Sequence, residues 1–224
     1  MKQSAKLIAY TTPLDGSGGR SLEEFVAYCA RVSNPGNQGN HDTSAKLIQY
    51  LASNAHWSPF EMAHATIELL TTRDIARQVL RHRSFSFQEF SQRYGAVQSF
   101  VGEGREARLQ DDKNRQNSIP LAEDEAGQSL QIEWSLRQST ALEEARKQYE
   151  WALSAGIAKE VARSVLPEGL TTSRLYMAGT IRSWIHYIQT RTHPSTQKEH
   201  RELALLCAEA LKPQFKIVEQ FVHR

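Results

Sequence analysis

The residues best suited to chemistry are gathered in one arginine-rich stretch in the first half of the chain. Residues 73–93 contain five arginines and only two acidic residues. The arginines are Arg73, Arg77, Arg81, Arg83 and Arg93. Their guanidinium groups, with the serines interleaved among them, suit phosphate oxygens. The stretch therefore predicts a site for a small anionic ligand, and a solvated basic face with a few ion pairs is the competing interpretation.

A mixture of arginine and phenylalanine also fits single-stranded nucleic acid. The basic run is short, however, and the whole chain of 224 residues balances 27 Lys and Arg against 25 Asp and Glu, for a net charge of +2. A small anion therefore suits the stretch better than a polymer, and a non-catalytic nucleic-acid-binding module remains the alternative.

Further polar residues follow downstream. Arg163 comes one turn after Glu160, which by itself predicts a helical ion pair. Arg182, His186 and Gln189 form a polar stripe at helical spacing, a pattern more typical of a solvent-exposed face than of a catalytic site.

Several chemistries are excluded by what the sequence lacks. It has neither a phosphate-binding P-loop nor a Rossmann glycine fingerprint, and it has no serine nucleophile elbow or zinc helix. Cys29 and Cys207 are far apart and lie among apolar neighbours, which favours buried thiols. No apolar run is long enough for a bilayer span, and no secretory signal is visible. These features predict a cytoplasmic protein.

The elements that must position these residues form an α+β pattern. Apolar periodicity predicts helices over residues 73–82, 181–191 and 195–211, and others that begin at Ser21, near Thr43 and at a capping box of Thr140 and Glu143. Strands are expected over 60–71 and 173–178, with an extended segment over 84–88. We expect a helix-rich single domain, residues 1–224, with a modest, mainly antiparallel sheet and a polar excursion or loop over 101–133.

The segment from Arg81 to Tyr94 resembles the signature of flavin-dependent thymidylate synthases. The matching positions are Arg81, His82, Arg83, Ser86, Glu89, Ser91, Arg93 and Tyr94. Gln88 stands where many members have Asn. Four further landmarks resemble the family in the right order: residues 30–33, 56–61, 162–167 and 182–191. The resemblance covers roughly residues 28–200.

The resemblance implies the flavin-dependent thymidylate synthase fold and a cytoplasmic methyltransferase that converts dUMP to dTMP. Methylenetetrahydrofolate would supply the carbon, and FAD reduced by NADPH would supply the hydride, without a cysteine nucleophile and without a metal. Homotetramers with active sites shared between subunits are expected, with no nucleic-acid or membrane partner. A member that binds flavin but has lost methyl transfer is the remaining alternative, and the intact Arg81–Tyr94 segment argues against it.

Site residues carry over from the resemblance position by position. The positions that would hold dUMP are Gln78, Arg81, Glu89, Ser91, Gln92, Arg93, Arg163 and Arg191. The positions that would contact FAD are Ser33, Ser58, Arg81, His82, Arg83, Glu89 and His186. Arg191, at the pyrimidine edge, and His56, near the flavin and the folate path, are the catalytic candidates. Thr180 stands where an FAD-binding Asn is common.

Overall fold

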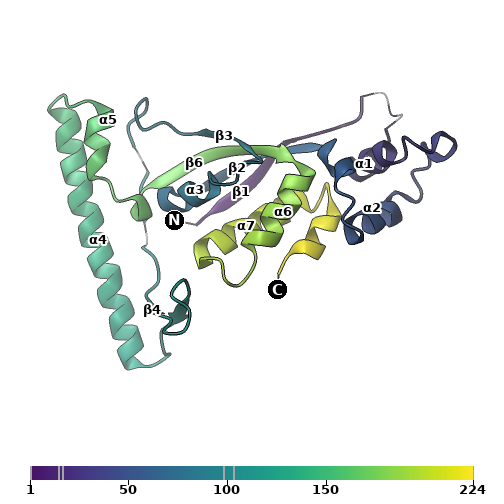
Figure 1. Ribbon diagram of the computed structural model, residues 1–224. Coiled ribbons are helices and arrows are strands. Elements are labelled where there is room, and N and C mark those ends of the chain that lie inside the picture. The colour runs from purple at the N-terminus through teal and green to yellow at the C-terminus, as the bar shows by residue number, and fades with distance from the viewer. Residues whose placement is uncertain (1, 15, 17, 98, 103, 224) are drawn as a thin grey trace. The chain divides into compact units, whose positions relative to one another are not determined.

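The computed structural model describes residues 2–14, 16, 18–97, 99–102 and 104–223 (Figure 1). Its main sheet has the strand order β1-β2-β6-β3, and β4 pairs with β5 in an antiparallel hairpin. The strands are β1 (Ser4–Tyr10), β2 (His64–Thr72), β3 (Ser86–Glu89), β4 (Arg108–Gln110), β5 (Ser118–Pro120) and β6 (Thr172–Thr180). The predicted α+β class, with a mainly antiparallel sheet, is confirmed.

The helices account for more of the chain than the strands. They are α1 (Leu22–Ala30), α2 (Ser44–Ser53), α3 (Arg73–Val79), α4 (Glu125–Ser154), α5 (Lys159–Ala162), α6 (Ile181–Arg191) and α7 (Lys198–Leu211). Short 3-10 helices include η2 (Ser58–Glu61), η3 (Arg163–Val165) and η4 (Glu168–Leu170). Helix α6 has the bounds that the sequence predicts.

The chain falls into two compact units. The first unit consists of Met1–Gln3, Leu70–Val79 and Glu89–Leu175. The second unit consists of Ser4–Leu69, Leu80–Gln88 and Tyr176–Arg224. Helices α3, α4 and α5 therefore belong to the first unit, and helices α1, α2, α6 and α7 belong to the second.

In the second unit, α6 and α7 pack side by side, and α7 also packs on β1 (Figure 1). The side chains of Trp184 and Ile188 on α6 and of Leu203 on α7 are fully buried. The indole of Trp184 donates to the carbonyl oxygen of Ala65 at 3.0 Å, which ties α6 to β2. Burial of these large apolar groups is the main source of stability for the unit.

The junction of β6 and α6 depends on a glycine. A Cβ added at Gly179 would lie 2.4 Å from the ring of Phe85, so a larger residue would push that ring aside. The next residue, Thr180, is the N-cap of α6 and accepts a hydrogen bond from the N–H of Ser183 at 3.1 Å. Close packing and the cap together fix where α6 begins.

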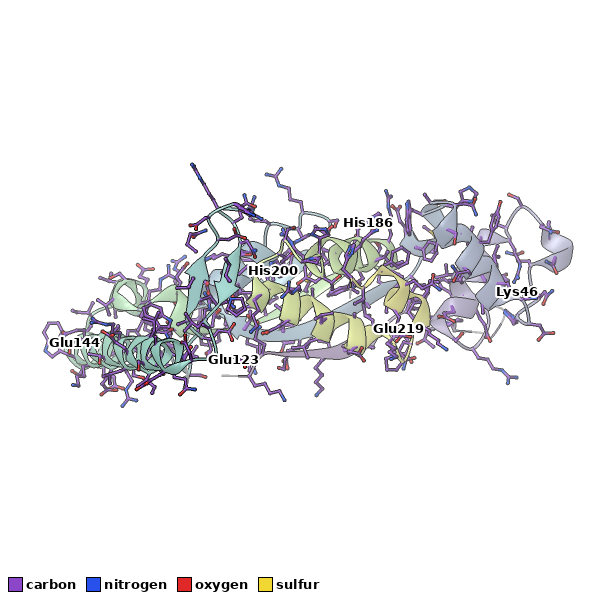
Figure 2. All side chains as sticks on the ribbon, turned by 90° about the horizontal axis from the view of Figure 1, so that it is seen from below. Lys46, Glu123, Glu144, His186, His200 and Glu219 are labelled. Carbon is purple, nitrogen blue, oxygen red and sulfur yellow. The ribbon has the colours of Figure 1, made fainter. Side chains whose placement is uncertain are left out.

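Helix α4 begins earlier than the sequence predicts. Asp124 is its N-cap and accepts from the N–H of Gly127 at 2.8 Å. The proposed capping box is wrong, because Thr140 lies inside the helix and its hydroxyl donates to the carbonyl of Leu136. The segment 101–133, predicted as an excursion or loop, therefore contains β4, β5 and the start of α4. The side chains of this helix are mostly exposed (Figure 2), and Gln138, Tyr149 and Ala152 are its buried residues, so no continuous apolar stripe marks it in the sequence.

Two helices end on a residue in the left-handed conformation. Gly156 follows α4 with φ of +80°, and the N–H of Ile157 donates back to Ala152 at 2.9 Å. Ala55 follows α2 in the same way with φ of 56°, and the N–H of His56 donates to Leu51 at 2.8 Å. Glycine adopts this conformation without a Cβ penalty, whereas alanine is destabilised by roughly 1–2 kcal/mol. The residue directly before His56 is therefore strained.

Candidate active site

His82 and Arg191 meet in the second unit although they are 109 residues apart. His82 follows α3, and Arg191 lies in the last turn of α6. The Nε of Arg191 donates to Nε2 of His82 at 2.8 Å. Burial, followed by the charges of Arg191 and Arg81, lowers the pKa of His82 from 6.5 to about 4. The ring is therefore neutral near pH 7, and the lone pair of its Nε2 accepts a hydrogen bond from the guanidinium group.

Two buried polar side chains lie beside this pair, and the sequence analysis missed both. The hydroxyl of Tyr187 on α6 lies 3.2 Å from Nε2 of His200 on α7. Burial, and then Arg191 and His82, lowers the pKa of His200 to about 3. One sequence pattern could have indicated a buried His200, because it shares the apolar face of its helix with Leu203 and Cys207.

His186 lies on the exposed side of α6, and Figure 2 labels it together with His200 on α7. Its ring lies 4.9 Å from that of Trp57. Desolvation, and then the charge of Arg182, lowers the pKa of His186. The predicted FAD position His186 therefore contacts this indole ring, and the predicted FAD position Ser58, which begins η2, directly follows Trp57 in the sequence.

The other candidates of the second unit are exposed. Arg81 and Arg83 flank His82, and their side chains are open to solvent. Ser33 follows α1, and His56 follows α2 with its ring edge-on to Tyr50 at 5.9 Å. Within the described part of the chain, no hydrogen bond joins Ser33 or His56 to the His82–Arg191 pair.

In the first unit, Glu89 is held by two buried groups. Its Oε1 accepts the hydroxyl of Ser173 at 2.6 Å and lies 3.7 Å from Nη1 of Arg73. Burial lowers the pKa of Arg73, Glu89 opposes this, and the nearby charges of Arg77 and Arg163 lower it further. Arg77 and Arg163 therefore lie near the Arg73–Glu89 pair, and Glu168, which raises the pKa of Arg73 and pairs with Arg77, lies near it as well.

Two arginines of the 73–93 stretch make exposed ion pairs in the first unit. Arg93 contacts Glu160 at 3.0 Å, and Arg77 contacts Glu168 at 3.3 Å. The expected side-chain pair of Glu160 with Arg163 is absent among these contacts, because Arg163 donates to the main-chain oxygen of Glu160. Exposed pairs of this kind contribute about 1 kcal/mol at most, so a phosphate can displace them readily.

Gln92 lies between the exposed side chains of Ser91 and Arg93 but is itself buried, with 4% of its surface exposed. In the described structure its Nε2 has no hydrogen-bond partner. The chain turns here, since the main-chain oxygen of Ser91 accepts from the N–H groups of Tyr94 and Gly95 at 3.1 and 3.0 Å. An unpaired buried donor is destabilising by about 1–3 kcal/mol, and a bound acceptor would relieve it.

The predicted dUMP and FAD positions are thus distributed over both units. The first unit contains Gln78, Glu89, Ser91, Gln92, Arg93 and Arg163. The second contains Ser33, His56, Ser58, Arg81, His82, Arg83, His186 and Arg191. The described residues include no group of three or more His, Cys, Asp or Glu side chains placed to hold a metal. None of the described helices has the length and apolar character needed to cross a bilayer.

Comparison with protein families gives a match over most of the chain. Residues 6–215 match the family model described as "Thymidylate synthase complementing protein". The chain is 49% identical over 212 residues to a probable flavin-dependent thymidylate synthase of Paramecium bursaria Chlorella virus 1, covering 95% of each chain. It is 48% identical over 216 residues to a flavin-dependent thymidylate synthase of a Synechocystis strain, covering 95% of this chain and 96% of that one.

A solved structure with the same fold is the UMP/dUMP methylase PolB of Streptomyces cacaoi, determined with bound 5-Br dUMP. The TM-score is 0.78 with 28% sequence identity, over 98% of this chain and 94% of that one. The same methylase has also been solved with 5-Br UMP.

The stability of the folded chain should decrease as the pH falls below about 6.5. The pKa of His200 is about 3 in the fold, below the ordinary 6.5, so the unfolded chain takes up the proton first. Stability is therefore complete above about pH 6.5 and is lost toward lower pH, with a slope approaching about 1.4 kcal/mol per pH unit for this one proton. His82 contributes in the same direction.

Urea denaturation of His200→Gln and of the unchanged chain between about pH 7 and pH 5 measures this slope. The substituted chain should lose less stability on acidification. His64→Gln, at an exposed position of β2, controls for the loss of an imidazole as such. Equal slopes for His200→Gln and the unchanged chain would contradict the prediction.

Proposed function

Because the chain belongs to the thymidylate synthase complementing protein family, we propose that it catalyses the reductive methylation of dUMP to dTMP. Its class is that of a flavin-dependent thymidylate synthase. In this proposal methylenetetrahydrofolate is the carbon donor, FAD is the flavin, and NADPH reduces it.

The observation that carries the proposal is the contact of Arg191 with His82. The two residues come from separate sequence landmarks, and the 2.8 Å hydrogen bond joins them in one unit. A persistent positive charge is thereby fixed beside the Arg81–Arg83 segment.

The first unit offers the groups that a nucleotide monophosphate needs. Arg93 and Ser91 are exposed and would take the phosphate, with Arg93 leaving its weak pair with Glu160. The buried, unpaired Nε2 of Gln92 offers a further donor. Glu89, oriented by Ser173, would accept from a sugar hydroxyl, and Gln78 and Arg163 belong to the same proposed dUMP set, which also includes Arg81 and Arg191 of the second unit.

The residues present fit an FAD molecule. Exposed Arg81 and Arg83 suit its pyrophosphate, while Trp57, which precedes Ser58 and contacts His186, offers an aromatic surface for a ring system. His82, Ser33 and Glu89 belong to the same proposed set. When bound, reduced FAD supplies the hydride of the reaction.

Arg191 is the residue that we assign to the chemical step. Its guanidinium, placed at the pyrimidine edge, would stabilise negative charge that develops on the ring during transfer. The neutral His82 orients that guanidinium without neutralising its charge. His56, held after the strained Ala55, is the second catalytic candidate, on the flavin and folate side.

The cysteines are poorly suited to a nucleophilic role. Cys207 is fully buried, and burial raises the pKa of its thiol far above the ordinary value. Burial also raises the pKa of Cys29. Since the thiolate is the attacking form, we propose that neither sulfur reacts with dUMP.

We further propose that residues 1–224 act as one catalytic domain within a cytoplasmic homotetramer. The support for assembly is helix α4, which leaves Ile132, Leu136 and Trp151 70%, 66% and 62% exposed. A hollow of about 610 Å³ lies beside Ile132, between α4 and the segments 106–107 and 120–123. Ile132 and Leu136 are one helical turn apart, and exposed apolar side chains grouped beside a hollow typically mark a protein interface, here with further copies of the chain.

The decisive experiment is a dTMP-formation assay with dUMP, methylenetetrahydrofolate, FAD and NADPH, each omitted in turn. Every omission should abolish product, the omission of FAD after the bound flavin has been removed from the protein. Arg191→Ala should lower turnover at least about 100-fold, because the transition-state charge loses its partner, while FAD remains bound on desalting. Arg115→Ala, at an exposed position beyond β4, is the control and should turn over normally. Near-normal turnover of Arg191→Ala would show that the assigned role is wrong.

The combined change Cys29→Ala and Cys207→Ala should leave turnover within about threefold of the unchanged chain, since no sulfur takes part in the proposed step. The small cavity left at position 207 should reduce stability by about 1 kcal/mol, which thermal unfolding measures. Loss of all activity in a double variant that still binds FAD would revive a cysteine mechanism.

Ile132→Glu should weaken assembly, because a charge cannot be buried unpaired in an apolar interface. Sedimentation of the FAD-loaded chain should show a tetramer, and the variant should shift toward smaller species. Glu133→Gln, on the adjacent exposed position of α4, is the matched control. An unchanged tetramer in Ile132→Glu would exclude this part of α4 from the interface.

A further inference from the structure

We propose that the buried Tyr187–His200 pair positions His82 and, through it, the guanidinium of Arg191. The two residues are positioning residues and do not touch the reacting atoms. The inference rests on the proposed function for its kinetic consequence, but its structural content concerns the second unit alone.

The contacts form a continuous chain from the core to Arg191. The ring of His82 stands edge-on to Tyr187, with centroids 4.9 Å apart and planes at 82°. It is also edge-on to His200 at 6.3 Å. Nε2 of His82 accepts from Nε of Arg191 at 2.8 Å. Rotation of the His82 ring would move Nε2 away from Arg191, so the two buried rings fix the direction of this acceptor.

The Tyr187–His200 hydrogen bond holds those two rings in place. Tyr187 is 1% exposed and His200 is 0% exposed, so neither can turn to water for a partner. Their 3.2 Å contact joins α6 to α7 at the level of His82. A buried hydroxyl without its partner would destabilise this arrangement by about 1–3 kcal/mol. The pair therefore locks both ring orientations.

The charges around His82 require that it stay neutral. It faces Arg191 and Tyr187 on α6, His200 on α7 and Arg81 on its own segment. A protonated imidazole could not accept from Arg191 and would be repelled by both arginines. Burial is the largest cause of the lowered pKa of His82, and Tyr187 and His200 help to exclude water from its ring. Loss of the pair should therefore raise the pKa of His82 toward 6.5.

The test compares three substitutions with a structural control. Tyr187→Phe removes only the hydroxyl, and His200→Ala opens a cavity that water can enter. His200→Gln keeps a neutral polar group for Tyr187 and is the rescue variant. Leu203→Ala, at a fully buried apolar position of α7, reproduces destabilisation without removing a hydrogen bond.

Two readouts are needed, and one of them is independent of turnover. Histidine NMR of the FAD-loaded protein reports the pKa and tautomer of His82. In His200→Ala this pKa should rise by at least about 1 unit, with a smaller rise in Tyr187→Phe and little change in the other variants. In dTMP formation, His200→Ala should lose about tenfold in kcat at pH 7 with a smaller change in KM for dUMP. Its activity should also fall further toward about pH 5.5, where the unchanged chain keeps its rate.

The outcomes separate this inference from the proposed function. An unchanged His82 pKa in His200→Ala and Tyr187→Phe would overturn the positioning role, whatever the enzyme does. So would a Leu203→Ala variant that reproduces the same pKa rise and pH profile, since that would indicate general loosening. A raised pKa in the absence of dTMP formation by the unchanged chain would support the positioning role and reject the proposed reaction.

Discussion

The site of the second unit depends on one neutral imidazole held among positive charges. His82 orients Arg191 only while its neutral ring can accept a hydrogen bond, and burial is what keeps the ring unprotonated. The burial in turn comes from the packing of α6 against α7. Core packing here therefore sets a protonation state, and the protonation state sets where a guanidinium points. Stability and chemistry cannot be varied independently at these positions.

Three arginines of residues 73–93 that lie in the first unit fall into two groups with different freedom. Arg73 is buried beside Glu89, so both charges are fixed, and removing either would leave the other unpaired. Arg93 and Arg77 pair with glutamates in solvent, where the partners exchange at little energetic expense. The Arg73–Glu89 pair therefore keeps a fixed geometry, whereas Arg93 and Arg77 can leave their glutamates to bind an anion. A chain with a net charge of only +2 therefore keeps Arg77 and Arg93 in pairs that an anion can replace.

Local patterns predicted local structure well and distant contacts poorly. Helix α6 has its predicted bounds because its apolar stripe and the Thr180 cap both lie within a few residues. The start of α4 was missed because its first turns bury almost no side chain. The sequence there has no helical repeat of apolar residues that would indicate a helix. The resemblance selected His82 and Arg191 as site residues, but it did not indicate their hydrogen bond. Ser173 and His200 were missed because their roles arise only from packing between elements.

The strained residue at the end of α2 can be replaced through a single base change in the gene. Ala55 holds a conformation that glycine adopts freely, and every alanine codon becomes a glycine codon by one base change. Most stabilising changes in a packed core require several side chains to change together. Replacing Ala55 by glycine would remove the backbone strain without a change in any other side chain. A single base change in the gene can therefore raise the stability of the chain directly before His56.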